Sequence, residues 1–248
     1  MRHCRLLTRR GLLSALAFWV GIGLITPEVK SEIPELYPPL RQYLRARIAE
    51  GNEIPEERKR LLEQVSQYVR GCSDTDTPSR IVFICTHNSR RSQMAQLWAA
   101  LAARYYERPD VLTYSGGTET TAFHPHAVEA LVRAGWKIMP RSRDDNAIQV
   151  ATWGPRSEPI ECFSKTYDDE PNPRRGFLAV MTCSDADRTC PRIPGASMRF
   201  ALPYIDPKIS DGTPRQTPTY DARCAQIARE MLYAFREQSA TLRHPEQD

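Results

Sequence analysis

The pattern of apolar residues changes near residue 80, from helical spacing alone to short apolar runs that alternate with helical spacing. Before that point, two polar segments have apolar side chains three or four residues apart, at Leu36, Leu40, Tyr43, Leu44 and Ile48 and then at Leu61, Leu62, Val65 and Val69. This spacing gathers side chains on one face of a helix. The intervening "GNEIPEE" contains a possible cap and a proline suited to a first helical turn. We therefore predict a helical hairpin and linker over residues 32–78.

After residue 80, short apolar runs alternate with helical patterns. The runs predict strands over residues 80–84, 111–114, 178–182 and 199–202. The patterns between and after them predict helices over residues 92–106, 125–134 and 220–238. Strands that alternate with helices indicate an α/β fold with a doubly wound, mostly parallel sheet, here in a domain over residues 79–248. Residues 139–176 are rich in proline, arginine and aspartate and are expected to be irregular, as a surface insertion or a lid.

The first 31 residues have the pattern of a targeting segment. They contain five basic groups and one acidic group, and residues 11–25 form an uncharged, mostly apolar stretch. That length is short for a membrane span and typical of a signal peptide, and "TRRGLL" resembles a twin-arginine export signal. We expect residues 1–31 to direct export to the periplasm or to tether the protein to a membrane. An uncleaved anchor, a misassigned start codon and a cytoplasmic protein are the alternatives.

Charge and cysteine content narrow the choice of partner and compartment. The chain has 34 basic and 30 acidic residues, so 29 of each remain once the first 31 residues are set aside. Because this balance leaves no general positive surface, nucleic acid is not an expected partner. Seven cysteines without a disulfide framework indicate reduced thiols, as in a cytoplasm, which conflicts with an export leader.

Candidate chemistry is concentrated in "IVFICTHNSRRS", residues 81–92. Cys85 ends a buried strand, and in a doubly wound sheet ligands bind beyond the carboxyl ends of the strands. The N–H groups of residues 86–91 can turn inward around an anion, at the positive N-terminus of the next helix. Arg91 adds a bidentate fork for an oxyanion, while this positive field and Ser92 favour Cys85 as a nucleophilic thiolate. A buried cysteine beside solvated arginines is the alternative.

The segment "CTHNSRRS" resembles the CxxNxxRS phosphate-binding loop of the low-molecular-weight protein tyrosine phosphatase superfamily. The resemblance covers roughly residues 79–240 and implies Cys85 as the nucleophile and Arg91 as the oxyanion binder. The oxyanion-binding loop that it implies consists of Thr86, His87, Asn88, Ser89, Arg90, Arg91 and Ser92. "YSGGTE" is similar to the family's SAGT, and Asp206-Pro207 resembles its late Asp-Pro, which implies Asp206 as the general acid.

Two branches of this superfamily, tyrosine phosphatases and thioredoxin-coupled arsenate reductases, differ in their later cysteines. "VMTCSDADRTCP" resembles the reductase segment in which two cysteines relay electrons. The resemblance implies that Cys85 attacks arsenic and that Cys183 then releases arsenite. Cys190 would resolve the Cys85–Cys183 disulfide, leaving a Cys183–Cys190 disulfide for a thioredoxin-like reductant. The phosphatases typically have aromatic residues after Asp-Pro, where this chain has Lys208 and Ile209.

The chain departs from the family pattern at three places. Arg90 stands where the reductases usually have a cysteine, and His87 replaces a common glycine. Residues 139–176 are foreign to the minimal domain. These departures leave the implied nucleophile, oxyanion binder and relay cysteines in place.

Three hypotheses follow, and the first is a three-cysteine arsenate reductase. The second is a phosphatase that hydrolyses phosphate monoesters through a phosphocysteine on Cys85, with Asp206 as the acid. The third is a non-catalytic oxyanion-binding or redox-sensing module. No resident cofactor is expected, and the spacing of the cysteines does not match a zinc site. The remaining thiols after the leader are expected to be unreactive, namely Cys72, Cys162 and Cys224.

Overall fold

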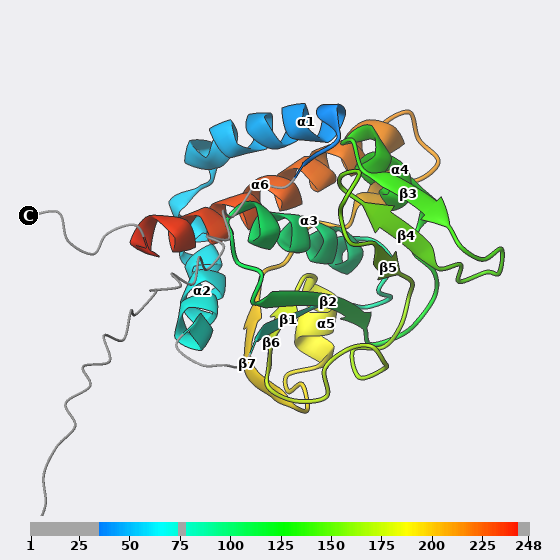
Figure 1. Ribbon diagram of the computed structural model, residues 1–248. Coiled ribbons are helices and arrows are strands. Elements are labelled where there is room, and N and C mark those ends of the chain that lie inside the picture. Colours follow the sequence, from blue (N-terminus) through cyan, green and yellow to red (C-terminus); the bar gives the residue numbers. More distant parts are fainter. Residues whose placement is uncertain (1–34, 74–77, 243–248) are drawn as a thin grey trace, which may run out of the picture. The chain divides into compact units, whose positions relative to one another are not determined.

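The computed structural model describes residues 35–73 and 78–242, and its main sheet is built around β1 (Ser79–Cys85). β1 pairs in parallel with β2 (Val111–Gly117) on one side and with β6 (Phe177–Met181) on the other. β7 (Ala196–Ala201) pairs in parallel with β6, so the strand order is β2-β1-β6-β7 (Figure 1). The predicted parallel sheet is confirmed.

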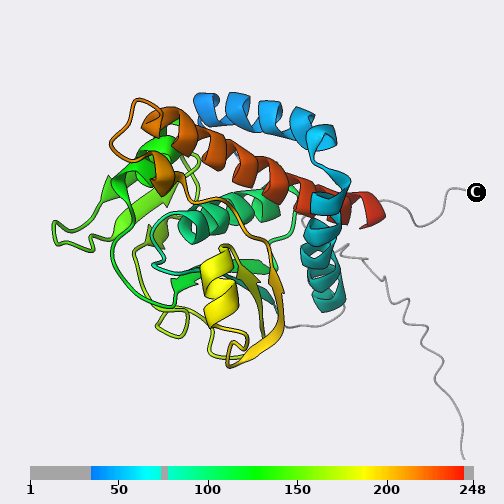
Figure 2. The ribbon, with the colours of Figure 1, turned by 180° about the vertical axis from the view of Figure 1, so that it is seen from behind.

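Helices cover both faces of this sheet. In chain order they are α1 (Pro38–Ala49), α2 (Glu56–Ser73), α3 (Arg91–Tyr105), α4 (Pro125–Arg133), α5 (Ser184–Thr189) and α6 (Gln216–Leu242), with 3-10 turns η1 (Glu50–Glu53) and η2 (Pro207–Ser210). Ile81 and Phe83 of β1 pack in the larger core with α3 and α6, while Val82 and Ile84 face a smaller core with α5 (Figures 1 and 2). Because successive strand residues point to opposite faces, β1 contributes to both cores. The sheet is doubly wound, as predicted.

The two predicted N-terminal helices form, and both pack on α6. Leu40 and Leu44 of α1 are buried in the larger core, as are Leu62 and Val65 of α2. Figure 1 shows α1 running along α6. The two helices therefore share their core with the α/β part of the chain, and a domain boundary at residues 78–79 stays a prediction.

The expectation of irregular structure over residues 139–176 is wrong in part. A second, antiparallel sheet forms from β3 (Lys137–Pro140), β4 (Gln149–Thr152) and β5 (Ile160–Cys162). These strands have three or four residues each, which is too short for an alternating pattern to stand out in the sequence. The rest of the segment leads back to β6 as loops and turns.

The predicted targeting segment, residues 1–31, lies outside the described residues, and so does Cys4. Within the part of the chain that the structure describes, none of the helices is both long enough and apolar enough to cross a membrane. Export and membrane attachment by residues 1–31 therefore stay predictions.

Arg58 of α2 and Glu230 of α6 form an ion pair that ties the N-terminal helices to the core. Arg58 Nε lies 3.1 Å from Glu230 Oε1 and 3.0 Å from Oε2, and the Glu230 side chain is 2% exposed. We expect Arg58→Ala to lower the free energy of unfolding by roughly 3 kcal/mol, because it leaves a buried carboxylate without its charged partner. Urea denaturation measures the change.

The matched control is Arg188→Ala, which breaks an arginine–aspartate pair of α5. The side chains of Arg188 and Asp185 are 75% and 64% exposed, so the expected loss is below about 1 kcal/mol. Equal unfolding midpoints for Arg58→Ala and the wild type would contradict the prediction.

Candidate functional site

The loop between β1 and α3, residues 86–90, lies at the carboxyl end of the main sheet, directly after Cys85. Asn88 adopts a left-handed conformation with a φ of 46°, which asparagine tolerates better than most residues. Gly117, at the end of β2, lies against the loop. A Cβ at this glycine would lie 2.6 Å from the carbonyl oxygen of Thr86 and 2.8 Å from the amide nitrogen of Asn88. The close approach of the loop backbone therefore requires glycine at position 117.

The sulfur of Cys85 is buried beside a serine hydroxyl. Cys85 Sγ lies 3.1 Å from Ser92 Oγ, and the whole residue is 3% exposed. Asn88 Nδ2 donates to the same Ser92 Oγ at 2.9 Å. Because a hydroxyl has a single hydrogen, an oxygen that accepts from Asn88 is left to donate toward Cys85. Ser92 is thus placed to stabilise a negative charge on the cysteine sulfur.

The backbone of the loop offers free hydrogen-bond donors. Within the described residues, the N–H groups of His87, Asn88, Ser89 and Arg90 donate to no other group. They lead into the N-terminus of α3, whose first turn has no acidic side chain. Free N–H groups at the positive end of a helix bind anions. We refer to these four N–H groups as the anion cradle.

Arg91 extends the cradle with a buried guanidinium group. Its Nη2 donates to Asp206 Oδ2 at 2.6 Å and its Nη1 donates to the carbonyl oxygen of Tyr204 at 3.1 Å. Its Nε is buried and has no partner among the described residues. Asp206 caps η2, because its Oδ1 accepts from the N–H of Lys208 at 3.1 Å. The structure therefore brings the predicted oxyanion binder and the predicted acid into direct contact.

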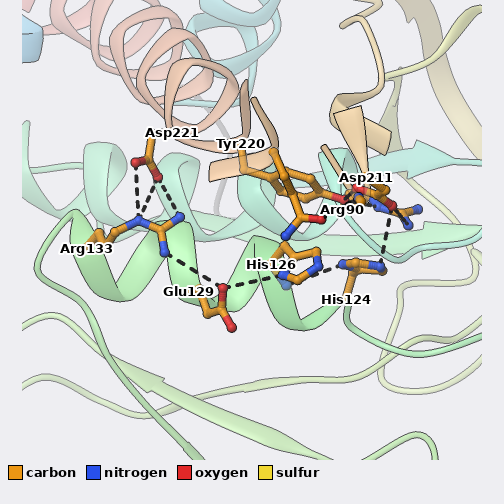
Figure 3. Close-up of polar contacts among 10 residues, drawn as sticks. Arg90, His124, His126, Glu129, Arg133, Asp211, Tyr220 and Asp221 are labelled. Carbon is orange, nitrogen blue, oxygen red and sulfur yellow. Dashed lines mark hydrogen bonds and ion pairs between the residues drawn. The ribbon is translucent and has the colours of Figure 1, made fainter. Parts of the chain in front are cut away.

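Two residues of the predicted oxyanion loop use their side chains elsewhere. Arg90 Nε donates to Tyr220 Oη at 2.8 Å (Figure 3). His87 Nε2 lies 3.2 Å from Glu119 Oε2, and both side chains are exposed. What these two residues offer to an anion is the backbone N–H.

Cys183 lies next to the loop, two residues after the strand that pairs with β1. It follows the end of β6 and caps α5, with its Sγ accepting from the N–H of Ala186 at 3.3 Å. The same sulfur is 3.5 Å from Thr86 Oγ1, one residue after Cys85. Cys183 is buried, whereas Cys190 at the other end of α5 is half-buried. The structure thus places one of the two predicted relay cysteines at the loop and the other nearer the surface.

The helix between these two cysteines is held in place by Arg199 of β7. Arg199 Nη2 donates to the carbonyl oxygen of Asp187 at 2.8 Å, and its Nε donates to that of Cys190 at 3.1 Å. A helical path of seven residues spans about 10 Å, while a disulfide needs Cα atoms within about 7 Å. A Cys183–Cys190 disulfide therefore requires α5 to unwind.

Residues 163–165 support the loop from outside, and sequence reasoning did not identify them. Ser164 Oγ donates to the carbonyl oxygen of His87 at 2.8 Å, and the N–H of Lys165 donates to Asn88 Oδ1 at 3.1 Å. Gln93 Nε2 of α3 donates to the carbonyl oxygen of Phe163 at 2.8 Å. Part of the segment predicted as an insertion or a lid therefore supports the loop. Its contacts lie about seventy residues away in sequence, so no local signal marks them.

The other described thiols have a different environment. Burial raises the pKa of Cys162 and of Cys224 to about 12, so both stay protonated near neutral pH. This agrees with the expectation that they are unreactive; the side chain of Cys72 lies outside the described residues. The part of the chain that the structure describes holds no group of three or more His, Cys, Asp or Glu arranged around a metal position.

Comparison with known proteins identifies relatives of the chain, although no protein-family model matches it. The arsenate reductase of Staphylococcus aureus strain Newman is 34% identical over 133 residues, which are 53% of this chain and 80% of that protein. Arsenate reductase 2 of Staphylococcus saprophyticus is 34% identical over 129 residues, 51% of this chain and 77% of that protein. A solved thioredoxin-dependent arsenate reductase of Corynebacterium glutamicum aligns with 79% of this chain and 85% of its own, at 16% identity and a TM-score of 0.37.

The family of this chain follows from its sequence relatives. At 34% identity over four-fifths of a relative's length, the chain belongs to the arsenate reductase family. Membership of this family makes the protein an enzyme.

Lys165 makes the stability of the folded protein depend on pH. The residue is 4% exposed, and burial lowers the pKa of its ammonium from 10.5 to about 8. Between these two values the unfolded chain holds the proton that the folded chain releases, so the lysine makes stability rise with pH in this window. Below pH 8 both states are charged, and burial of the ammonium opposes folding.

We expect Lys165→Met to stabilise the protein at pH 7 by roughly 1–3 kcal/mol and to lose this advantage as the pH approaches 10.5. The backbone bond to Asn88 is retained in this variant. Urea denaturation at pH 7 and pH 9.5 measures the difference from the wild type. Lys137→Met, which removes an exposed ammonium, should leave the pH profile unchanged. A wild type at least as stable as Lys165→Met at both pH values would refute the expectation.

Proposed function

We propose that this protein reduces arsenate, with Cys85 as the nucleophile and Cys183 as the second thiol. The position of Cys183 is the observation that carries the proposal, because its sulfur lies 3.5 Å from Thr86 Oγ1 at the start of the loop. Hydrolysis of a phosphate ester needs one thiol, whereas reduction of arsenate needs a second thiol within reach of the first. Arsenate also has the tetrahedral shape and the negative charge that the anion cradle and Arg91 suit.

The first step uses the anion cradle and Asp206. Arsenate binds to the N–H groups of the loop and to Arg91, whose buried Nε has no other partner among the described residues. The Cys85 thiolate attacks arsenic(V) and an S–As bond forms. The bond from arsenic to one hydroxyl group of the arsenate breaks, and that hydroxyl leaves as water with a proton from Asp206, so the charge that develops on the leaving oxygen is neutralised.

The second step transfers two electrons. The Cys183 thiolate attacks the sulfur of Cys85, an S–S bond forms and the S–As bond breaks. The electron pair of the broken bond stays with arsenic, which leaves as arsenite, arsenic(III). Two thiols have then become one disulfide, which balances the reduction of arsenic by two electrons.

The third step regenerates the nucleophile. The Cys190 thiolate attacks Cys183, which releases Cys85 as a thiolate and leaves a Cys183–Cys190 disulfide. Since α5 keeps these two residues apart, this exchange includes unwinding of the helix. A dithiol protein of the thioredoxin kind then reduces the disulfide by the same exchange chemistry.

Hydrolysis of phosphate monoesters is the second candidate function. It is favoured by the Arg91–Asp206 contact of 2.6 Å, because an acid held beside the oxyanion binder can protonate the oxygen of a leaving alcohol. Phosphocysteine formation on Cys85 would use the same cradle. Cys183 and Cys190 would have no role in that reaction, and this separates the two functions experimentally.

Cys85→Ser should abolish turnover of both arsenate and an aryl phosphate, because the serine hydroxyl is a far weaker nucleophile than a thiolate. Binding of inorganic phosphate should persist, since the cradle consists of backbone groups and Arg91. Arg91→Lys should weaken that binding about tenfold or more, because a point charge cannot replace the planar fork. Calorimetry measures binding and steady-state assays measure turnover. More than trace turnover in Cys85→Ser would rule out both enzymatic functions.

Replacement of the relay cysteines should separate reduction from hydrolysis. With arsenate, Cys183→Ser should stop at the first adduct, and Cys190→Ser should trap a Cys85–Cys183 disulfide after one turnover. Aryl phosphate hydrolysis should survive both changes. Mass spectrometry of digested protein identifies the trapped bond, and an assay with thioredoxin, thioredoxin reductase and NADPH measures multiple turnover.

The control for these variants is Cys224→Ala, which removes a buried thiol of the larger core. It should leave arsenate turnover unchanged. If both serine variants turn over arsenate repeatedly at the wild-type rate, the relay is incorrect.

A further inference from the structure

Two adjacent arginines of the loop bind the two ends of one short segment. Arg91 holds Asp206, the residue before η2, and Arg90 reaches Asp211, the residue after it. The distance from Arg90 Nη2 to Asp211 Oδ2 is 3.5 Å. The segment that contains the proposed acid is therefore attached to the loop at both ends.

Tyr220 of α6 completes the second attachment. Its hydroxyl accepts from Arg90 Nε at 2.8 Å and donates to Asp211 Oδ1 at 2.9 Å (Figure 3). The tyrosine is buried, and its ring stacks on His124 with centroids 5.8 Å apart. Burial raises the pKa of Tyr220 to about 12, so the hydroxyl keeps the proton that it donates to Asp211. Each of Arg90, Tyr220 and Asp211 contacts the other two, and we call these three contacts the Arg90 clamp.

The two attachments differ in what the reaction does to them. An oxyanion in the cradle needs donors from Arg91, so the bond from Arg91 to Asp206 cannot alone keep the acid in place during the reaction. The Arg90 side chain instead turns toward α6 and bonds there to Tyr220 (Figure 3). Its bonds to Tyr220 and Asp211 can therefore persist while Arg91 serves the substrate.

We propose that Arg90 is a positioning residue, which holds Asp206 in reach of the leaving oxygen through Asp211 and Tyr220. The inference rests on the proposed function to the extent that Asp206 is the acid, a role common to arsenate reduction and phosphate hydrolysis. It also assigns a role to Arg90, which stands where the reductases usually have a cysteine. The clamp restricts η2, which is only four residues long, so movement at Asp211 is passed on to Asp206.

A double-mutant cycle in the full chain tests the clamp. Arg90→Met should lower kcat for arsenate about tenfold, part of the factor that a general acid contributes, with KM for arsenate changed less than about twofold. In an Asp206→Asn background, Arg90→Met should cause no further loss, because two residues that act through one group are not additive. Tyr220→Phe removes a single oxygen and should lower kcat in the same direction by a smaller factor.

Arg133→Met is the matched control. Arg133 Nη2 of α4 pairs with Asp221 Oδ1 of α6 at 2.7 Å, close to the clamp but outside it (Figure 3). The same loss of an arginine–aspartate pair between helices should leave kcat unchanged. Thermal unfolding of every variant shows whether a loss of kcat merely follows a loss of stability.

Three outcomes would overturn the inference. The first is a loss of the same factor from Arg90→Met in the Asp206→Asn and wild-type backgrounds. The second is an unchanged kcat in both Arg90→Met and Tyr220→Phe. The third is a wild-type kcat in Asp206→Asn. A wild type that hydrolyses phenyl phosphate but does not reduce arsenate would refute the proposed function alone, because the same cycle, measured with phenyl phosphate, still tests the clamp.

Discussion

The side-chain amide of Asn88 is the contact on which the arrangement of the site depends. It donates to Ser92 Oγ at 2.9 Å and accepts from the N–H of Lys165 at 3.1 Å and from Gln93 Nε2 at 3.3 Å. One buried residue thereby directs the Ser92 hydroxyl toward Cys85 and fixes the loop to a distant segment. An aspartate at this position could not donate to Ser92 and would place a negative charge beside the anion cradle. The amide is the side chain that satisfies both demands.

Helix α5 links the chemistry of the proposed relay to local stability. The helix separates Cys183 from Cys190 in the reduced protein, and Arg199 bonds to its last turn. A disulfide between the two cysteines and an intact helix exclude each other on geometry. The free energy of local unfolding therefore enters the equilibrium between the dithiol and the disulfide. If α5 is stable, the dithiol form of Cys183 and Cys190 is favoured over their disulfide. The exchange that releases Cys85 as a thiolate is then slower.

The sequence was most informative where the site is contiguous, and least where the site depends on distant contacts. The strand, loop and helix around Cys85 and Arg91 could be predicted because one apolar run meets one helical pattern within a few residues. Lys165 could not be assigned to the site, because it lies 77 residues from Asn88 and no periodic pattern surrounds it. Arg90 was assigned to the oxyanion loop from its position, yet Tyr220, 130 residues away, receives its Nε–H. The small second sheet escaped notice because its strands are shorter than one recognisable alternation.

The Arg91–Asp206 pair has a consequence for the selection of anions. Any ion that binds through Arg91 must displace a carboxylate of the protein or share the guanidinium with it, so Asp206 competes with that ion for the same charge. When the carboxylate is displaced, the net affinity of the ion is the free energy of its own pair with Arg91 minus that of the Arg91–Asp206 pair. A monovalent halide offers one contact point and gains little from such an exchange. A tetrahedral oxyanion presents several oxygens, which can take the Arg91 donors and the cradle N–H groups together. We therefore expect Asp206 to compete with an incoming anion for Arg91, so that only an anion with enough charge and enough oxygens binds at the site.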